Sequence, residues 1–271
     1  MSGVDVDRAL EVAREAAAAA IEILVEARER TGRAEASEKN PRDLVTEADH
    51  AAERAIVEVL SGAFPDHGVL AEESDGRSGS GNLRWVIDPL DGTANYVHDF
   101  PVWAVSVALF DGDEPLVGLV VDPVRDEWFS AIAGRGARVD PGDPDRGRAM
   151  AVSGETTPGA AIVATGFPFR SPDQIDRYLG AFRTLFEEVS DMRRAGSAAL
   201  DLAWTAAGRL DGFWEIGLNL WDIAAGELLV EEAGGRVTGW EGGEGHRASG
   251  TIAAGTPAVH ALLVATLEEW A

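Results

Sequence analysis

Cysteine is absent from the 271 residues, and lysine occurs once, as Lys39. Without cysteine the chain forms neither disulfide bonds nor thiolate metal sites. No stretch approaches the roughly 18 uninterrupted apolar residues of a membrane-spanning helix. The first residues, MSGVDVDRALEVAREA, are acidic and do not form a basic and then apolar leader. We therefore expect a cytoplasmic protein that does not enter a membrane.

Positive charge is scarce, because 47 Asp and Glu face 23 Lys and Arg and leave a net charge of −24. A basic face for nucleic acid is therefore not expected. Two explanations of the acidity stay open. One is a halophilic adaptation, since concentrated salt screens self-repulsion; the other is a GC-rich genome, which also favours Arg over Lys. The same negative charge repels an anionic substrate. A phosphate ester would therefore need bound cations that make the electrostatic potential at its binding site positive.

The first half of the chain is predicted to combine two helices with short strands. Helical stripes span Val6–Arg30 and Glu47–Gly62, and a polar connector over Thr31–Arg42 joins them. Thr46 is the expected N-cap of the second helix, with Asp49 at the capping-box position. The later strands are spaced as in an antiparallel meander. Predicted strands are Val69–Ser74, Trp85–Ile87, Val102–Phe110, Pro115–Val121 and Glu127–Ala131.

A segment rich in Gly, Pro, Asp and Arg, from Gly134 to Arg148, is the expected domain boundary. Residues 1–146 would form an N-terminal α+β domain and residues 147–271 a C-terminal α/β domain. Beyond the boundary strands and helices alternate, which predicts two sheets covered by helices. Predicted strands lie at 160–164, 191–194, 212–216, 235–239 and 251–254, and predicted helical faces within 175–186, 200–210, 221–233 and 259–270.

The most informative stretch is Trp85–Phe100, WVIDPLDGTANYVHDF. An apolar strand ends in Asp88 and Asp91, and two such carboxylates can converge on hard divalent cations. Gly92 lets a ligand approach the backbone, and the N–H groups of Gly92 and Thr93, at a helix start, can receive an anion such as phosphate. Alone, an Asp-Pro-Leu-Asp-Gly turn is equally compatible with an ordinary acidic corner. The combination favours metal-assisted phosphoryl chemistry.

Further motifs accompany this stretch in a fixed order. They are DLVTEAD at Asp43–Asp49, AEES at Ala71–Ser74, RAGSAA at Arg194–Ala199 and WDIAAG at Trp221–Gly226. Together they resemble the inositol monophosphatase family, within the larger group of lithium-sensitive, magnesium-dependent phosphatases. The resemblance covers essentially the whole chain. It implies a layered αβαβα sugar-phosphatase fold, in the α/β class, and a homodimer.

The resemblance also implies a set of metal ligands. Glu72 and Asp88, helped by the Leu90 carbonyl, resemble the ligands of the tightest metal. Asp88, Asp91 and Asp222 resemble those of a second metal, with Asp88 bridging. A third, looser ion would lie near Glu72, so the expected cofactor is Mg²⁺, two to three ions in each active site. Two cations roughly 3.5–4 Å apart can bind the attacking and leaving oxygens of an in-line displacement.

Catalytic and substrate-binding roles follow from the same resemblance. Thr93 and Asp49 resemble the pair that orients and deprotonates the attacking water, and Glu73 resembles an acid near the metal-bound water. Lys39 is a further candidate, because the family often has a lysine in this loop. The implied substrate contacts are Gly92 and Thr93 for the phosphate, Gly196, Ser197 and Ala198 for the alcohol portion, and Glu215 for its hydroxyl groups.

The expected activity is Mg²⁺-dependent hydrolysis of a small phosphorylated polyol or sugar. myo-Inositol 1-phosphate leads, because RRAGSAALDLAWTAAGRLDGFWEIG resembles the bacterial-type members of the family. Fructose-1,6-bisphosphatase, or a dual enzyme, is the first alternative; histidinol phosphatase and nucleotide 3′-phosphatase rank lower. The carboxylates contact only the phosphate, so discrimination is expected in the loops around Lys39, Phe167–Ser171 and Glu215. A regulatory protein on the same scaffold would predict a broken ligand set, whereas every expected acid is present.

Overall fold

Two helices form the outer layer of the N-terminal half. The computed structural model describes the backbone of residues 4–31, 36–40 and 43–271, and the side chains of residues 4–30 and 46–271. Helix α1 (Val6–Thr31) confirms the helix predicted over Val6–Arg30, and it buries a stripe of mostly small side chains that ends at Leu24. Helix α2 (Glu47–Ala63) begins at the predicted capping box. The Thr46 side chain accepts the N–H of Asp49, and the Asp49 carboxylate accepts the N–H of Thr46.

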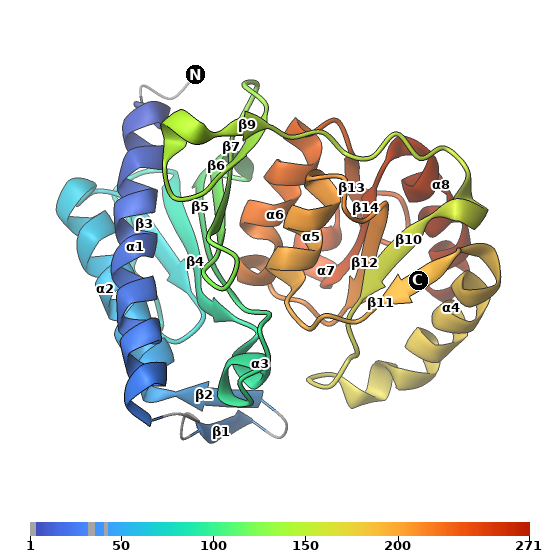
Figure 1. Cartoon of the computed structure of the whole chain (residues 1–271), viewed down its shortest axis with the longest axis horizontal. Helices are drawn as coiled ribbons and strands as arrows, with labels where there is room; N and C mark the ends of the chain where they lie inside the picture. The colour runs from blue at the N-terminus through green and yellow to red at the C-terminus, as the bar shows by residue number, and fades with distance from the viewer. Residues whose placement is uncertain (1–3, 32–35, 41–42) are drawn as a thin grey trace.

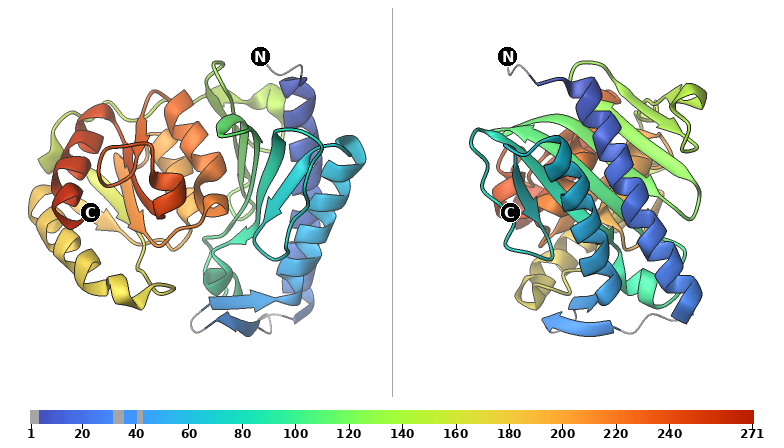
Figure 2. Two further views of the ribbon diagram at one scale, coloured as in Figure 1. Left: turned by 180° about the vertical axis from the view of Figure 1, so that it is seen from behind. Right: turned by 90° about the vertical axis from the view of Figure 1, so that its left-hand side faces the viewer.

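These helices pack side by side on one face of a seven-stranded sheet (Figures 1 and 2). In order across the sheet the strands are β3 (Gly68–Ala71), β4 (Leu83–Asp91), β5 (Ala104–Asp111), β6 (Glu114–Asp122), β7 (Glu127–Ile132), β8 (Ala137–Asp140) and β9 (Arg148–Ala149). β3 and β4 are parallel, and all other neighbouring pairs are antiparallel. The predicted meander is confirmed in β5, β6 and β7.

The first sheet continues into the segment expected to separate two domains. β8 lies inside that segment, and β9 lies beyond residue 146. The composition there suggested a linker. β9, however, is an edge strand of two residues, and edge strands are held by backbone pairing and tolerate polar and charged side chains. β8 is only four residues long, with Ala137 and Val139 as its buried apolar residues, so both strands carry little apolar signal.

The second sheet has five strands and completes the C-terminal half. Its order is β11 (Asp191–Arg193), β10 (Ile162–Thr165), β12 (Gly212–Ile216), β14 (Thr251–Gly255) and β13 (Arg236–Thr238). Helices α4 (Ile175–Glu188) and α8 (Pro257–Leu267) pack on its outer face. Helices α5 (Ala198–Ala206) and α6 (Leu220–Glu232) pack against its inner face.

The two halves share one hydrophobic core. It joins Phe110 and Val120 of the first sheet to Leu202, Leu229 and Phe213 of the second half. Figure 1 shows the resulting layers: α1 and α2, the first sheet, α5 and α6, the second sheet, and finally α4 and α8. The layered αβαβα fold expected from the resemblance is confirmed.

Short elements connect these layers. The connector expected over Thr31–Arg42 contains β1 (Ala36–Asn40), which pairs antiparallel with β2 (Asp43–Thr46). A strand of sequence ASEKN lacks the apolar alternation from which strands are predicted. Two further short helices are α3 (Thr93–Val97) and α7 (His246–Ser249). Within the described ranges, no helix is both long enough and apolar enough to cross a bilayer.

Candidate active site

The end of β4 places two aspartates on the same side of the strand. In a regular strand, residues three positions apart point to opposite faces. Asp88 lies opposite Ser106 and Asp91 opposite Ala104, so the register with β5 shifts between the two aspartates. The extra residue on β4 is a β-bulge, and Pro89, which has no N–H group, lies within it. The bulge lets both carboxyl groups turn toward the same space.

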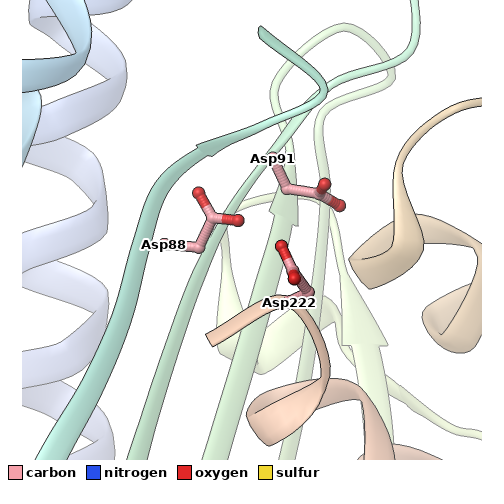
Figure 3. Close-up of side chains that lie close together, drawn as sticks. All are labelled: Asp88, Asp91 and Asp222. Atoms are coloured by element: carbon pink, nitrogen blue, oxygen red, sulfur yellow. The ribbon is translucent and has the colours of Figure 1, made fainter. Parts of the chain in front are cut away.

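Asp222 approaches the same space from the other half of the chain. It lies in the first turn of α6, where its carboxylate accepts the N–H of Asn219 at 2.6 Å in a capping box. One oxygen from each of Asp88, Asp91 and Asp222 lies within 4.8 Å of the others, and all three residues are buried. Figure 3 shows their carboxyl groups facing one another. The structure therefore brings together aspartates that are far apart in the sequence.

Glu72 joins these aspartates through the pairing of β3 with β4. Ala71 lies opposite Ile87 in the parallel register, so the next residues, Glu72 and Asp88, are neighbours. Their carboxyl groups share a hydrogen bond, and the Glu72 side chain is 9% exposed. We call Glu72, Asp88, Asp91 and Asp222 the acidic cluster.

Burial and mutual repulsion raise the pKa values within the acidic cluster. Burial and the charge of Asp222 raise the pKa of Glu72 to about 8 and that of Asp91 to about 6. Burial, followed by the charge of Glu72, holds the pKa of Asp88 well above its ordinary value. Without a cation the cluster therefore retains protons near neutral pH, and a bound cation would release them. Buried oxygen donors of this kind fit a hard divalent cation.

Asp49 and Thr93 lie together beside the acidic cluster. The Thr93 hydroxyl is 3.2 Å from Oδ1 of Asp49 and 3.1 Å from the carbonyl oxygen of Leu90. Asp49 is 1% exposed, and burial raises its pKa although Thr46 donates hydrogen bonds to it. A carboxylate with a raised pKa beside a hydroxyl group is suited to act as a general base.

Gly92 forms the corner between β4 and α3. Its φ of +92° lies in the left-handed region that glycine adopts without strain. A Cβ atom there would lie 3.0 Å from the carbonyl oxygen of Val102 and 3.2 Å from that of Gly196. Both the backbone conformation and the close approach of these two carbonyls therefore favour glycine.

The first turn of α5 holds Asp91 in position. The Ser197 hydroxyl and the Ala199 N–H donate to Oδ2 of Asp91 at 2.6 and 2.7 Å. The same hydroxyl accepts the N–H of Leu200 and caps α5. Ser197 therefore orients a candidate metal ligand, and its contact with substrate stays a prediction.

A cavity opens beside the acidic cluster, between segments of the two halves. The Glu215 carboxyl group packs directly on Gly166, where a Cβ atom would lie only 2.0 Å from Oε1. Desolvation, and then the charges of Asp222 and Asp91, raise the pKa of Glu215 to about 8. The lining includes Asp91 and Asp222 together with the substrate contacts implied by the resemblance: Gly92, Thr93, Gly196, Ser197, Ala198 and Glu215.

Glu73 and Lys39 are the remaining predicted residues. The Glu73 carboxylate lies 3.8 Å from Nδ1 of His50, and its charge contributes to the raised pKa of Asp49. Glu73 therefore belongs to the surroundings of Asp49, and its role near a metal-bound water stays a prediction. The side chain of Lys39 lies outside the described residues.

Three residues at the site were not singled out from sequence, although one of them, Arg170, lies in the loop Phe167–Ser171 where substrate discrimination was expected. The buried carboxylate of Glu53 accepts the N–H of Glu73 at 2.7 Å. Asn95 donates to the carbonyls of Val102 and Ala195 at 2.8 and 2.9 Å. Arg170 lies near Glu72 and Asp222. Glu53 could have been found from the sequence, because it follows Asp49 by one helical turn and therefore lies on the same face of the helix. The roles of the other two depend on contacts that form only in the folded chain.

Comparison with known proteins identifies the family of this chain. The model of the inositol monophosphatase family matches residues 5–270. The chain belongs to the inositol monophosphatase family. Its curated relatives include the Nus factor SuhB of Pseudomonas aeruginosa, which is 44% identical over 264 residues that cover 96% of this chain and 95% of the relative.

Solved structures of family members have the same fold. The extragenic suppressor protein suhB from Bartonella henselae superposes with a TM-score of 0.87 at 39% identity, covering 96% of each chain. The inositol monophosphatase from Anabaena (Nostoc) sp. PCC 7120 superposes with a TM-score of 0.86 at 36% identity, covering 98% of this chain and 97% of that one. Relatives of this chain thus include proteins named for phosphatase activity and proteins named as Nus or suppressor factors.

Proposed function

We propose that this family member is a Mg²⁺-dependent phosphatase that hydrolyses small phosphate monoesters, with myo-inositol 1-phosphate as the leading substrate. The observation that supports this most directly is the convergence of Asp88, Asp91 and Asp222 within 4.8 Å. The cavity beside them is lined by residues that the family resemblance assigns to the substrate. The Anabaena relative, named an inositol monophosphatase, supports the choice of ester.

The acidic cluster and the Leu90 carbonyl would hold two to three Mg²⁺ ions. Mg²⁺ binds through few protein oxygens and keeps several waters, which suits a site made of carboxylates. When bound, it would lower the pKa of a coordinated water and neutralise charge on the leaving oxygen. Ser197 fixes the orientation of Asp91, and the capping box of α6 fixes that of Asp222. The chain therefore orients these two ligands through its own hydrogen bonds.

Thr93 and Asp49 are proposed to handle the attacking water. The Thr93 hydroxyl can accept a hydrogen bond from that water while donating its own proton to Oδ1 of Asp49, 3.2 Å away. Thr93 then takes a proton from the water as its own proton passes to Asp49, whose pKa burial raises above its ordinary value, which favours this transfer. The nearby charge of Glu73 acts in the same direction.

The far side of the cavity would receive the alcohol portion of the ester. Glu215, with a pKa of about 8, is largely protonated at neutral pH and can both donate to and accept from a hydroxyl group. The adjoining backbone of Gly196 and Ala198 also lines this side. Fructose-1,6-bisphosphate remains an alternative substrate, because Arg170 and Arg194 line the same cavity and could face a second phosphate.

A regulatory, non-catalytic role is the second candidate. The Pseudomonas relative is named a Nus factor and not a phosphatase. This role does not require the acidic cluster and predicts a broken ligand set, whereas hydrolysis requires all members of the cluster. Asp88, Asp91 and Asp222 converge, Glu72 shares a hydrogen bond with Asp88, and the Asp49–Thr93 pair is formed, which favours catalysis.

Hydrolysis assays separate these proposals. Purified protein in concentrated KCl with Mg²⁺ is tested against inositol 1-phosphate, fructose 1,6-bisphosphate, histidinol phosphate and a nucleoside 3′-phosphate by phosphate release. Asp88→Asn should lower turnover more than about 100-fold, beyond the loss caused by an outer-sphere partner, while circular dichroism stays unchanged. Folded wild-type protein that binds Mg²⁺ but cleaves none of these esters would refute catalysis and favour the regulatory role.

A further inference from the structure

Arg170 extends from the segment 166–171 to the edge of the acidic cluster. This segment follows β10 and lines the cavity. Nη2 of Arg170 lies 3.4 Å from Oε1 of Glu72, and Nη1 lies 3.7 Å from Oδ1 of Asp222. Glu72 belongs to the N-terminal half and Asp222 to the C-terminal half. The guanidinium group therefore connects the two halves across the site.

These two contacts are loose ion pairs. Charge-assisted hydrogen bonds are usually about 2.7–2.9 Å long, and both distances exceed that range. The Arg170 side chain is 40% exposed, whereas those of Glu72 and Asp222 are 9% and 4% exposed. The guanidinium group thus lies on the solvent side of buried acids. A partly exposed pair of this kind contributes little stability, so a stronger cation can replace it.

The neighbouring residues fix one part of the segment. Phe167 packs edge-on against Tyr178 and Phe169, with ring centroids 5.6 and 5.7 Å apart. The Arg194 guanidinium lies over both phenylalanine rings, 5.3 and 5.5 Å from their centroids. Arg194 is therefore held by aromatic rings, whereas Arg170 reaches the carboxylates.

A divalent cation at this edge would need the oxygen atoms that Arg170 contacts. A guanidinium group and a metal ion repel each other and cannot both occupy the same two oxygen atoms. We propose that Arg170 is a displaceable counter-cation, which occupies the Glu72 and Asp222 oxygens of the metal-free protein and is expelled when a divalent cation binds. This inference rests on the metal site of the proposed function. Arg170 would then set the cation concentration at which the site fills.

Metal binding to the full chain tests this role without any substrate. Mn²⁺ is titrated calorimetrically into metal-free wild type, Arg170→Gln, Arg170→Lys and Arg183→Gln. Arg183 is an exposed arginine of α4, in the outer layer, and serves as the matched control. Arg170→Gln should bind Mn²⁺ about two- to fivefold more tightly, because the ion no longer breaks an ion pair of ordinary strength. Arg170→Lys should fall between Arg170→Gln and wild type, and the control should match wild type.

Thermal unfolding gives a second readout, because the substitution that tightens Mn²⁺ binding should destabilise the metal-free protein. Removing the counter-charge should lower the Tm of the metal-free protein by a small amount, in keeping with the two- to fivefold change in affinity, whereas the Tm at saturating Mn²⁺ should equal that of wild type. A merely structural arginine would lower both. Equal or weaker Mn²⁺ binding by Arg170→Gln, or an equal fall of both Tm values, would overturn the inference alone. Failure of wild type to bind Mn²⁺ would overturn the proposed function as well.

Discussion

Raising the pH should destabilise the metal-free protein through its acidic cluster. The pKa of Glu72 rises from 4.5 to about 8 on folding, because burial and Asp222 disfavour its charged form. Between these values the folded protein holds a proton that the unfolded chain has already lost. The stability that this proton provides is therefore complete below pH 4.5 and is lost as the pH rises through 8.

The size of this loss follows from the separation of the two pKa values. At about 1.4 kcal/mol for each pH unit, Glu72 alone sets an upper limit of about 5 kcal/mol. Asp91, with a pKa of about 6, titrates together with Glu72 and adds less than its own separation would suggest. We expect a fall of about 2–5 kcal/mol from pH 5 to pH 8, a large part of the ~5–15 kcal/mol that stabilises an ordinary domain.

Urea unfolding at fixed high KCl measures this effect. Free energies are determined from pH 5 to pH 8.5 in EDTA and in saturating Mg²⁺, which adds about 2.7 kcal/mol at 100 times its Kd. Because Mg²⁺ replaces the protons, the pH-dependent fall should be much smaller in its presence. Glu72→Gln should flatten the EDTA profile, whereas Glu58→Gln, at an exposed position of α2, should not. Identical EDTA profiles for wild type and Glu72→Gln would refute the reasoning.

Other expectations concern catalysis, the corner at β4, the ligand support and the solvent. Asp49→Asn should lower kcat by about 10²–10⁴-fold while calorimetric Mn²⁺ affinity stays intact; loss of both would contradict its role as a base. Gly92→Ala should cost about 1–3 kcal/mol in urea unfolding, more than Gly112→Ala, which has a positive φ but open space. Ser197→Ala should weaken Mn²⁺ binding about 10- to 100-fold, and an unchanged affinity would show that Asp91 needs no orientation. Activity and folding should both decline as KCl is withdrawn; equal stability in dilute buffer would leave GC-driven composition as the explanation of the acidity. Sedimentation should find a homodimer, and a monomer at micromolar concentration would contradict that expectation.

Local sequence determined the elements that carry the site. The apolar run before Asp88 specifies a buried strand, and Thr46 with Asp49 specifies the start of α2. Both signals involve residues close together in the chain, whose backbone geometry depends little on distant partners. The order of the motifs was enough to indicate the family and its layered fold.

The tertiary structure decided how these elements meet. A bulge against β5 turns Asp88 and Asp91 to one side, and the parallel register of β3 on β4 brings Glu72 beside Asp88. The N-cap of α5 supplies Ser197, and the first turn of α6 supplies Asp222. None of these neighbours is adjacent in the chain, and neither are the contacts of Arg170. Their placement depends on strand register and on the packing of two helices between two sheets, which arise only when distant segments bury apolar surface together.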